Sequence, residues 1–176
     1  MATRRIDASE LKTVARELRA GDRVILSGRI YTARDAAHRR IFELLDAGEK
    51  PPFELAGAAI YYAGPTPARE GMAVGSCGPT TSGRMDAFSP RLLDLGLSAM
   101  IGKGMRSEDV CRAIERNGAV YLCAVGGAGA LIAKSVKSAK EIAFLDLGCE
   151  SVKELIVDEL PLTVGIDCVG GNMFKR

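Results

Sequence analysis

The chain has 176 residues, of which 47% are hydrophobic and 26% charged, and its formal net charge is +2. These proportions indicate a folded globular protein with one sizeable core and argue against disorder. So small a net charge disfavours a nucleic-acid or membrane partner. No apolar run approaches the roughly 20 residues that cross a bilayer, and no signal-peptide core is present. We therefore expect a cytoplasmic protein.

The cysteines are odd in number and widely spaced: Cys77, Cys111, Cys123, Cys149 and Cys168. No CxxC pair occurs, which disfavours a zinc knuckle or a local cluster-binding loop. We therefore predict no metal site in this chain. Several of these cysteines lie in apolar, strand-like stretches, where a reduced and buried thiol is the usual role. Cys77 stands apart because it directly precedes a Gly-Pro-Thr-Thr turn.

The first half of the chain predicts alternating helices and strands. Apolar residues at helical spacing predict a helix over Ala8–Leu18, and we interpret the Arg4–Arg5 pair before it as a frayed terminus. A strand, a helix that stops before Gly48, and a second strand follow. Their ranges are Arg23–Tyr31, Asp35–Ala47 and Leu55–Tyr62. The Gly/Pro-containing stretch Gly64–Gly71 predicts a loop.

The second half predicts three short units, each made of a strand, a glycine-containing loop and a helix. The strands are Val74–Ser76, Ser98–Ile101 and Ala119–Val125, and the helices are Met85–Leu95, Ser107–Asn117 and Ala130–Ser135. Two more strands, Ile142–Leu145 and Leu162–Ile166, complete the predicted core. Helices that follow parallel strands cover a sheet. The sequence therefore predicts an α/β fold in a single domain over residues 1–176.

One stretch combines a forced turn with several hydroxyl groups: Gly78-Pro79-Thr80-Thr81-Ser82-Gly83-Arg84-Met85-Asp86. Gly and Pro direct a turn, and the Thr and Ser residues supply oxygens that cap a helix start. Backbone N–H groups and hydroxyls aimed at one spot suit an anion. The planar guanidinium of Arg84 matches a carboxylate or a phosphate. An ordinary capped helix with a solvated arginine explains the same residues.

Two other places could supply charge to a bound anion. Lys103 lies between glycines just after a predicted strand, and ligands gather at the carboxyl ends of strands in open α/β sheets; a solvated loop lysine is the alternative. Arg34 and His38 share one face of a predicted helix. A buried arginine is costly without an anionic partner, so Arg34 needs Asp35, another internal acid or a ligand. His38, the single histidine, is either structural or catalytic.

The run Gly126-Gly127-Ala128-Gly129 invites a nucleotide-binding interpretation that its spacing does not support. It lacks the Gly-Lys-Ser/Thr of a Walker loop. Ile132 stands where the dinucleotide fingerprint has its third glycine or alanine. Close packing of a helix on the sheet explains these glycines better.

Taken together, the motifs resemble the β region of class I fumarases and L-tartrate dehydratases. The resemblance extends from about Gly21 to Phe174, and residues 78–86 are its most specific part. It is carried by that stretch together with Tyr31-Thr32-Ala33-Arg34-Asp35-Ala36-Ala37-His38, Gly102-Lys103-Gly104-Met105-Arg106-Ser107, Gly126-Gly127-Ala128-Gly129-Ala130 and Asp146-Leu147-Gly148-Cys149-Glu150.

This resemblance implies a swivelling β/β/α domain that is either a separate β subunit or fused to a larger α region. In the family the α region holds a 4Fe–4S cluster, so we expect a hetero-oligomer whose site is shared with an α subunit that carries the cluster. The chain alone should bind no cluster and be inactive. The implied reaction is reversible hydration of fumarate to (S)-malate. Two alternatives stay open, namely dehydration of L-tartrate to oxaloacetate and a non-catalytic domain that binds a dicarboxylate.

The resemblance also implies roles for single residues. Arg34, Arg84 and Lys103 match contacts to the substrate carboxylates, and Thr80 matches the base that acts on the carbon-bound proton. Removing a proton beside a carboxylate builds up negative charge, which preorganised cations stabilise. The partner's iron would act as a Lewis acid on the departing hydroxyl. Supporting residues, which orient these groups without touching the substrate, are expected to be Asp35, His38, Thr81 and Asp86.

Overall fold

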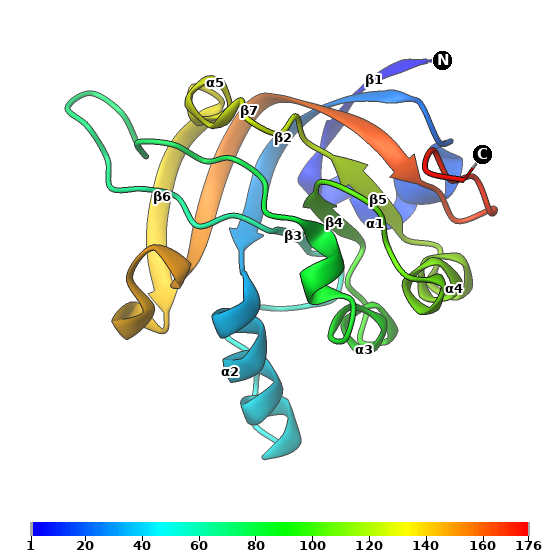
Figure 1. Cartoon of the computed structure of the whole chain (residues 1–176), viewed down its shortest axis with the longest axis horizontal. Coiled ribbons are helices and arrows are strands. Elements are labelled where there is room, and N and C mark those ends of the chain that lie inside the picture. Colours follow the sequence, from blue (N-terminus) through cyan, green and yellow to red (C-terminus); the bar gives the residue numbers. More distant parts are fainter. Residues whose placement is uncertain (1, 176) are drawn as a thin grey trace.

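The computed structural model describes residues 2–175, and this part of the chain forms one mixed α/β unit built on a seven-stranded sheet (Figure 1). The strands are β1 (Thr3–Asp7), β2 (Arg23–Thr32), β3 (Ala59–Tyr61), β4 (Ala99–Gly102), β5 (Val120–Cys123), β6 (Val136–Ala143) and β7 (Val152–Ile166). The helices are α1 (Leu11–Val14), α2 (Asp35–Asp46), α3 (Ser89–Asp94), α4 (Glu108–Asn117) and α5 (Gly129–Ala133). Short 3-10 segments are η1 (Ala8–Glu10), η2 (Ala15–Glu17), η3 (Ser82–Met85) and η4 (Leu145–Glu150).

Five of the strands close into a ring. β2, β3, β4 and β5 are parallel neighbours, and β7 pairs antiparallel with both β5 and β2. Outside this ring, β1 extends the sheet beside the first half of β2, and β6 lies antiparallel beside the first half of β7. At 15 residues, β7 is long enough to contact three other strands, and it arches across the molecule beside β2 and β6 (Figure 1).

Alternating side chains of the short parallel strands divide the core into two clusters, as the pleat of a strand requires. Ile60, Met100 and Tyr121 belong to a cluster that also contains the buried faces of α2, α3 and α4. The residues next to them in sequence, Tyr61, Ile101 and Leu122, belong to the opposite cluster with α1 and α5. Because both faces of these strands are covered, their sequences are apolar throughout.

Most predicted elements form, but the chain begins differently from the prediction. β1 pairs in parallel with β2 along all of its residues, from Thr3 to Asp7. The interpretation of Arg4–Arg5 as a frayed terminus is therefore wrong. Only Ile6 of this strand is buried, so its sequence carries little of the apolar alternation by which strands are recognised.

Four further predictions need correction. No strand forms at Val74–Ser76, and the helix predicted over Met85–Leu95 is divided between η3 and α3. β6 begins before the strand predicted at Ile142–Leu145, and β7 begins well before Leu162. The first part of β7 is not recognised from the sequence because exposed acids and a positive φ at Glu159 interrupt its apolar pattern. The interruption lies where the register of β7 with β2 shifts. Among the described residues, no helix is long and apolar enough to cross a membrane.

Candidate functional site

The residues singled out from the sequence come from segments that meet at the carboxyl edge of the parallel strands. Arg34 follows β2 and Lys103 follows β4. The Thr80 N–H donates to the carbonyl oxygen of Tyr62, just after β3, at 2.6 Å. Thr81 forms a parallel bridge with Lys103. This edge is where ligands are expected in sheets of this kind, so the structure brings the predicted segments side by side.

Arg84 is connected to the start of α2 by an ion pair with Asp35. Its Nε donates to Asp35 Oδ1 at 3.1 Å, and its Nη2 lies 2.8 Å from Asp35 Oδ2 without the geometry of a second hydrogen bond. The side chain of Arg84 is 52% exposed, whereas that of Asp35 is 19% exposed. Asp35, expected to support Arg34, thus contacts Arg84 instead.

Arg34 has a different acidic partner. Its Nε lies 3.5 Å from Glu150 Oε1, an ion-pair distance, and finds no hydrogen-bond partner among residues 2–175. The side chain packs over Gly64, where an added Cβ would come within 3.2 Å of Arg34 Nη1. Of the alternatives left open by the sequence, an internal acid is therefore the one found. Glu150 was missed as a site residue although it lies in one of the motifs of the resemblance.

His38 supports the turn at Arg34 from inside the protein. Its Nδ1 lies 2.7 Å from the carbonyl oxygen of Arg34, and its ring packs against Tyr62 and Phe88. Burial, with a smaller effect from the charge of Arg106, lowers the pKa of His38 to about 4, despite the opposing hydrogen bond with Arg34. The imidazole is neutral at neutral pH. Because its exposed fraction is 0%, it cannot touch a ligand that arrives from solvent.

Lys103 lies against the glycine-rich loop. A Cβ added to Gly126 would lie 3.2 Å from Lys103 Cδ and 3.6 Å from its Nζ. Gly129 approaches the Gly-Pro-Thr-Thr turn in the same way, because its added Cβ would lie 3.0 Å from the backbone nitrogen of Gly78 and 2.3 Å from Ser76 Oγ, just before the turn. These glycines are thus needed for close packing, but against the loops of the candidate site rather than between a helix and the sheet. Lys103 takes part in no ion pair within the described part of the chain, unlike Arg34 and Arg84.

Metal-ligating side chains do not gather in the described part of the chain. Among residues 2–175, no group of three or more His, Cys, Asp or Glu is placed to hold a metal ion. Cys77 and Cys111 are buried, Cys123 and Cys168 are partly buried, and Cys149 is exposed. Burial raises the pKa of the Cys77 thiol to about 12, so the cysteine beside the turn is an unreactive core residue.

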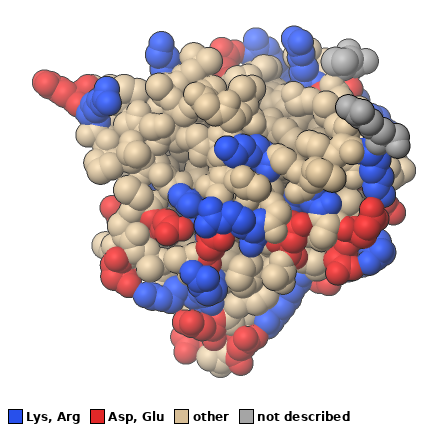
Figure 2. All heavy atoms as spheres, viewed as in Figure 1, with Lys and Arg blue, Asp and Glu red and all other residues tan. Residues whose placement is uncertain are grey.

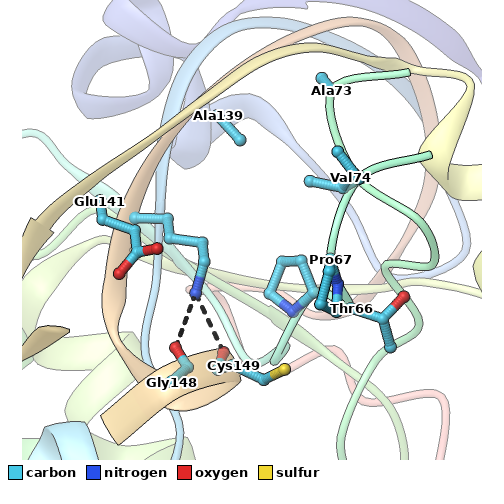
Figure 3. A pocket seen from close by; sticks show the side chains of 11 residues that line it. Thr66, Pro67, Ala73, Val74, Ala139, Glu141, Gly148 and Cys149 are labelled. Atoms are coloured by element: carbon cyan, nitrogen blue, oxygen red, sulfur yellow. Dashed lines mark hydrogen bonds between the residues drawn. The ribbon is translucent and has the colours of Figure 1, made fainter. Parts of the chain in front are cut away.

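A cavity of about 440 Å³ lies beside the predicted site rather than within it (Figure 3). Lys153, which is 9% exposed, is one of the residues that line it. Its Nζ donates to the carbonyl oxygens of Gly148 and Cys149 at 3.2 and 3.1 Å and to Ser151 Oγ at 2.7 Å. Two of these hydrogen bonds hold η4, the segment that ends with Glu150, and the third holds Ser151, which directly follows it. No predicted site residue lines this cavity, which is enclosed by Pro65, Thr66, Pro67, Ala68, Ala73, Val74, Ala139, Glu141, Gly148, Cys149 and Lys153.

Charges of both signs are mixed on the face seen in Figure 2. Blue and red spheres alternate over its lower half, and the upper half is mostly uncharged, with a blue group near the middle of the face and a few charged groups along the upper edge. This distribution agrees with the pairing of Arg84 with Asp35 and of Arg34 with Glu150. Two of the three predicted cations, Arg34 and Arg84, are thus already paired with acids of this chain, whereas Lys103 has no such partner within residues 2–175.

The chain belongs to the fumarase C-terminus family, whose model matches residues 2–176. It is 42% identical over 171 residues to the "Putative L(+)-tartrate dehydratase subunit beta" of Methanocaldococcus jannaschii, an alignment that covers 94% of this chain and 88% of that protein. It is 40% identical over 158 residues to "Fumarate hydratase 2" of Leishmania major, covering 89% of this chain and 28% of the relative. It is 38% identical over 156 residues to "Fumarate hydratase class I, aerobic" of Escherichia coli, covering 88% of this chain and again 28% of the relative. The family resemblance inferred from the motifs is confirmed, and the chain matches only about a quarter of the length of the fumarate hydratases.

Proposed function

We propose that this chain is the β subunit of a hydro-lyase that reversibly hydrates fumarate to (S)-malate and is completed by an α subunit. The observation that carries the proposal is the meeting of Arg34, Lys103 and the Thr80–Arg84 turn at one edge of the sheet. The names of the relatives support the class of reaction. The similar part of the fumarate hydratases is 28% of their length, which supports the need for further residues from a partner.

In this proposal the chain binds the substrate and moves one proton. Arg34, Arg84 and Lys103 hold the two carboxylates. Thr80, whose alkoxide form these cations favour, takes the proton from the carbon beside one of them and becomes a neutral hydroxyl. Negative charge that develops there is stabilised by cations already in place. The substrate must compete with Asp35 and Glu150 for the two guanidinium groups. Both ion pairs are partly exposed, and such pairs are weak enough to be exchanged.

The metal chemistry is assigned to the partner. The class I fumarate hydratase family is generally iron–sulfur dependent, and a bound cluster supplies a Lewis acid for the hydroxyl that leaves or enters. Since the described side chains of this chain provide no ligand set, we place the 4Fe–4S cluster in the α subunit. Three exposed apolar side chains near the glycine loop and the Lys103 loop, Met105, Val125 and Leu131, support coverage of this edge by a second protein.

L-Tartrate is the second candidate substrate. One relative, aligned over 88% of its own length, is named a putative tartrate dehydratase β subunit, and both diacids present carboxylates to the same cations. A dicarboxylate-binding scaffold without catalysis is the alternative of another class. The swivelling nature of the domain, its extent over residues 1–176 and its cytoplasmic location remain parts of the proposal.

The decisive experiment is co-expression of the chain with its cluster-bearing partner, followed by anaerobic assay on fumarate and on L-tartrate. We expect turnover of at least one diacid by the complex and none by the isolated chain. Turnover by the isolated chain would refute the shared site. Absence of turnover by a complex with a full complement of iron and sulfide would favour the scaffold.

A further inference from the structure

Arg106 is a buried cation that the proposed chemistry does not use. It lies between β4 and α4, three residues after Lys103, and its side chain is 0% exposed. Its Nε donates to Asp86 Oδ1 at 2.7 Å, and its Nη2 donates to Ser89 Oγ at 2.7 Å. The guanidinium also lies 5.3 Å from the ring centre of Tyr62 and 4.9 Å from that of Tyr121, within the range of cation–π contact.

The contacts of Arg106 join the two loops that carry the candidate site. Asp86 ends the turn that contains Thr80 and Arg84, and its Oδ2 accepts a second hydrogen bond from the Ser107 N–H at 2.6 Å. One carboxylate thus holds both the side chain of Arg106 and the backbone of the residue after it. At the other end of the same two loops, the Ser82 N–H donates to the carbonyl oxygen of Lys103 at 2.9 Å.

Tyr121 connects the two loops at a third point, between these two ends. Its hydroxyl is hydrogen-bonded at 2.9 Å both to Ser82 Oγ and to the carbonyl oxygen of Gly104. Ser82 and Tyr121 are both fully buried. Lys103 and Gly104 therefore have a fixed position relative to the Thr80–Arg84 turn, and Arg106 packs on the ring of the tyrosine that connects them.

A buried ion pair is poor evidence for a gain in stability, because apolar residues of similar volume often stabilise a core as well or better. A specific geometry is the better-supported use of such a pair. We infer that Arg106 is a positioning residue, which fixes the separation between the Lys103 loop and the Thr80–Arg84 turn so that their polar groups face one substrate. The loop-holding part of this inference concerns the chain alone, and its kinetic consequence rests on the proposed function.

Arg106→Lys and Tyr121→Phe test the inference. The lysine keeps the charge but loses the planar fork that reaches Asp86 and Ser89 together. The phenylalanine keeps the ring but removes both hydroxyl contacts, so it provides a second variant if Arg106→Lys does not fold. Arg116→Lys is the matched control, because Arg116 forms two hydrogen bonds with Asp94, each of 2.8 Å, on the exposed side of α4.

Hydrogen exchange of the isolated chain gives the first readout and needs no activity. We expect faster amide exchange in residues 80–86 and 102–107 of both test variants, with unchanged exchange in β5 and β7. Arg116→Lys should exchange like the unaltered chain. Unchanged protection of both loops in the test variants, or loosening of the whole sheet to the same extent, would overturn the inference.

Steady-state kinetics of the α–β complex gives the second readout. If Arg106 contributed only to stability, its substitution would leave the kinetics of the folded complex unchanged. Misplacement of binding groups by about 1 Å can cost on the order of 100-fold in rate, so kcat/KM of Arg106→Lys should fall by about that factor. The loss should lie mainly in kcat, because charge stabilisation in the transition state depends most on placement. Added guanidinium should restore part of the activity of Arg106→Ala, and urea should not.

The two readouts separate the inference from the proposed function. Normal kcat and KM in folded Arg106→Lys and Tyr121→Phe would overturn the positioning role while leaving the proposed function in place. An unaltered complex inactive on both diacids would refute the proposed function, and the exchange data would still decide whether Arg106 holds the two loops.

Discussion

The two arginines of the candidate site each face an acid of their own chain. Arg84 pairs with Asp35 and Arg34 with Glu150. Partly exposed pairs of this kind contribute about 1 kcal/mol or less, so a substrate carboxylate can replace either acid at small cost. The sequence singled out both arginines as candidates because each lies in a motif beside a predicted strand or turn. It could not identify Glu150 as a partner, since that contact joins residues far apart in the chain.

Arg84→Ala should remove most activity of the proposed α–β complex without unfolding this chain. Truncation of a half-exposed side chain leaves no cavity, while the loss of one preorganised charge-stabilising group typically costs about 100-fold or more in kcat. Steady-state kinetics together with a thermal melt checks both parts. Arg91→Ala is the control, since Arg91 is similarly exposed and also pairs with an acid of α2, Asp46. Equal kinetics in the two variants would remove Arg84 from the site.

His38 should make stability depend on pH below neutrality. The pKa of the buried imidazole is about 4, against an ordinary value of 6.5, so the unfolded chain takes up the proton first. Stability from this residue is therefore complete above about pH 6.5 and declines as the pH falls towards 4. Between pH 7 and pH 5 the loss should be about 2 kcal/mol.

Urea unfolding at the two pH values, in the native chain and in His38→Gln, measures this loss. Every other titrating group is common to both proteins, so the difference between their pH dependences isolates the imidazole. Glutamine stays neutral over the whole range and should show the smaller decline. Identical pH dependences would contradict the assignment of a buried, neutral His38.

At the scale of elements, the short strands with apolar residues on both faces, and the helices with clear caps, could be predicted. β4, β5 and α4 are of this kind, and Ser107 caps α4 through a hydrogen bond to the Val110 N–H. β1 and most of β6 could not, because their residues lie largely at the surface and give no regular alternation. Their pairing is determined by the long neighbours β2 and β7, whose partners no local pattern specifies.

The end of β4 requires a glycine, and its replacement tests how tightly the site loops approach the sheet. A Cβ on Gly102 would lie 1.9 Å from Ser82 Oγ and 2.9 Å from the Tyr62 ring. Gly102→Ala should therefore destabilise the chain by roughly 1–3 kcal/mol, the usual cost of overpacking. Denaturant unfolding measures this change.

Gly83→Ala is the control for this substitution. It adds the same methyl group in the neighbouring turn, where the nearest atom outside the local backbone is the carbonyl oxygen of Met105 at 3.7 Å. That is ordinary van der Waals contact, so the variant should be close to neutral. Equal destabilisation by the two substitutions would show that the close approach of Ser82 to β4 is not the reason why position 102 requires a glycine.

At the scale of the whole molecule, a buried carboxylate joins the segment before β2 to the segment after β7. Asp167 follows β7 directly and is 2% exposed. It accepts hydrogen bonds from the N–H groups of Ala20 at 2.8 Å, Val169 at 2.9 Å and Gly171 at 2.8 Å. Ala20 lies just before β2, so this one side chain connects the segments at which two strands of the ring begin and end.

Asp167→Asn should cost roughly 1–3 kcal/mol, because the amide group presents a donor to one of the backbone N–H groups that the carboxylate accepted. Equilibrium unfolding in urea is the measurement. Asp158→Asn makes the same change at an exposed acid whose hydrogen-bond partner is Ser27 Oγ at 3.2 Å, and it should leave stability close to that of the native chain. A larger loss in Asp158→Asn than in Asp167→Asn would contradict this account of ring closure.

The position of β7 in the ring has a consequence for biosynthesis. β7 pairs with β2, which is made early, and with β5 and β6, which are made later. While a ribosome is still adding residues before Val152, the open flanks of β2 and β5 have no strand to fill the gap between them. Such unpaired flanks favour aggregation. Nascent chains halted before β7 should therefore depend on chaperones far more than chains released after it.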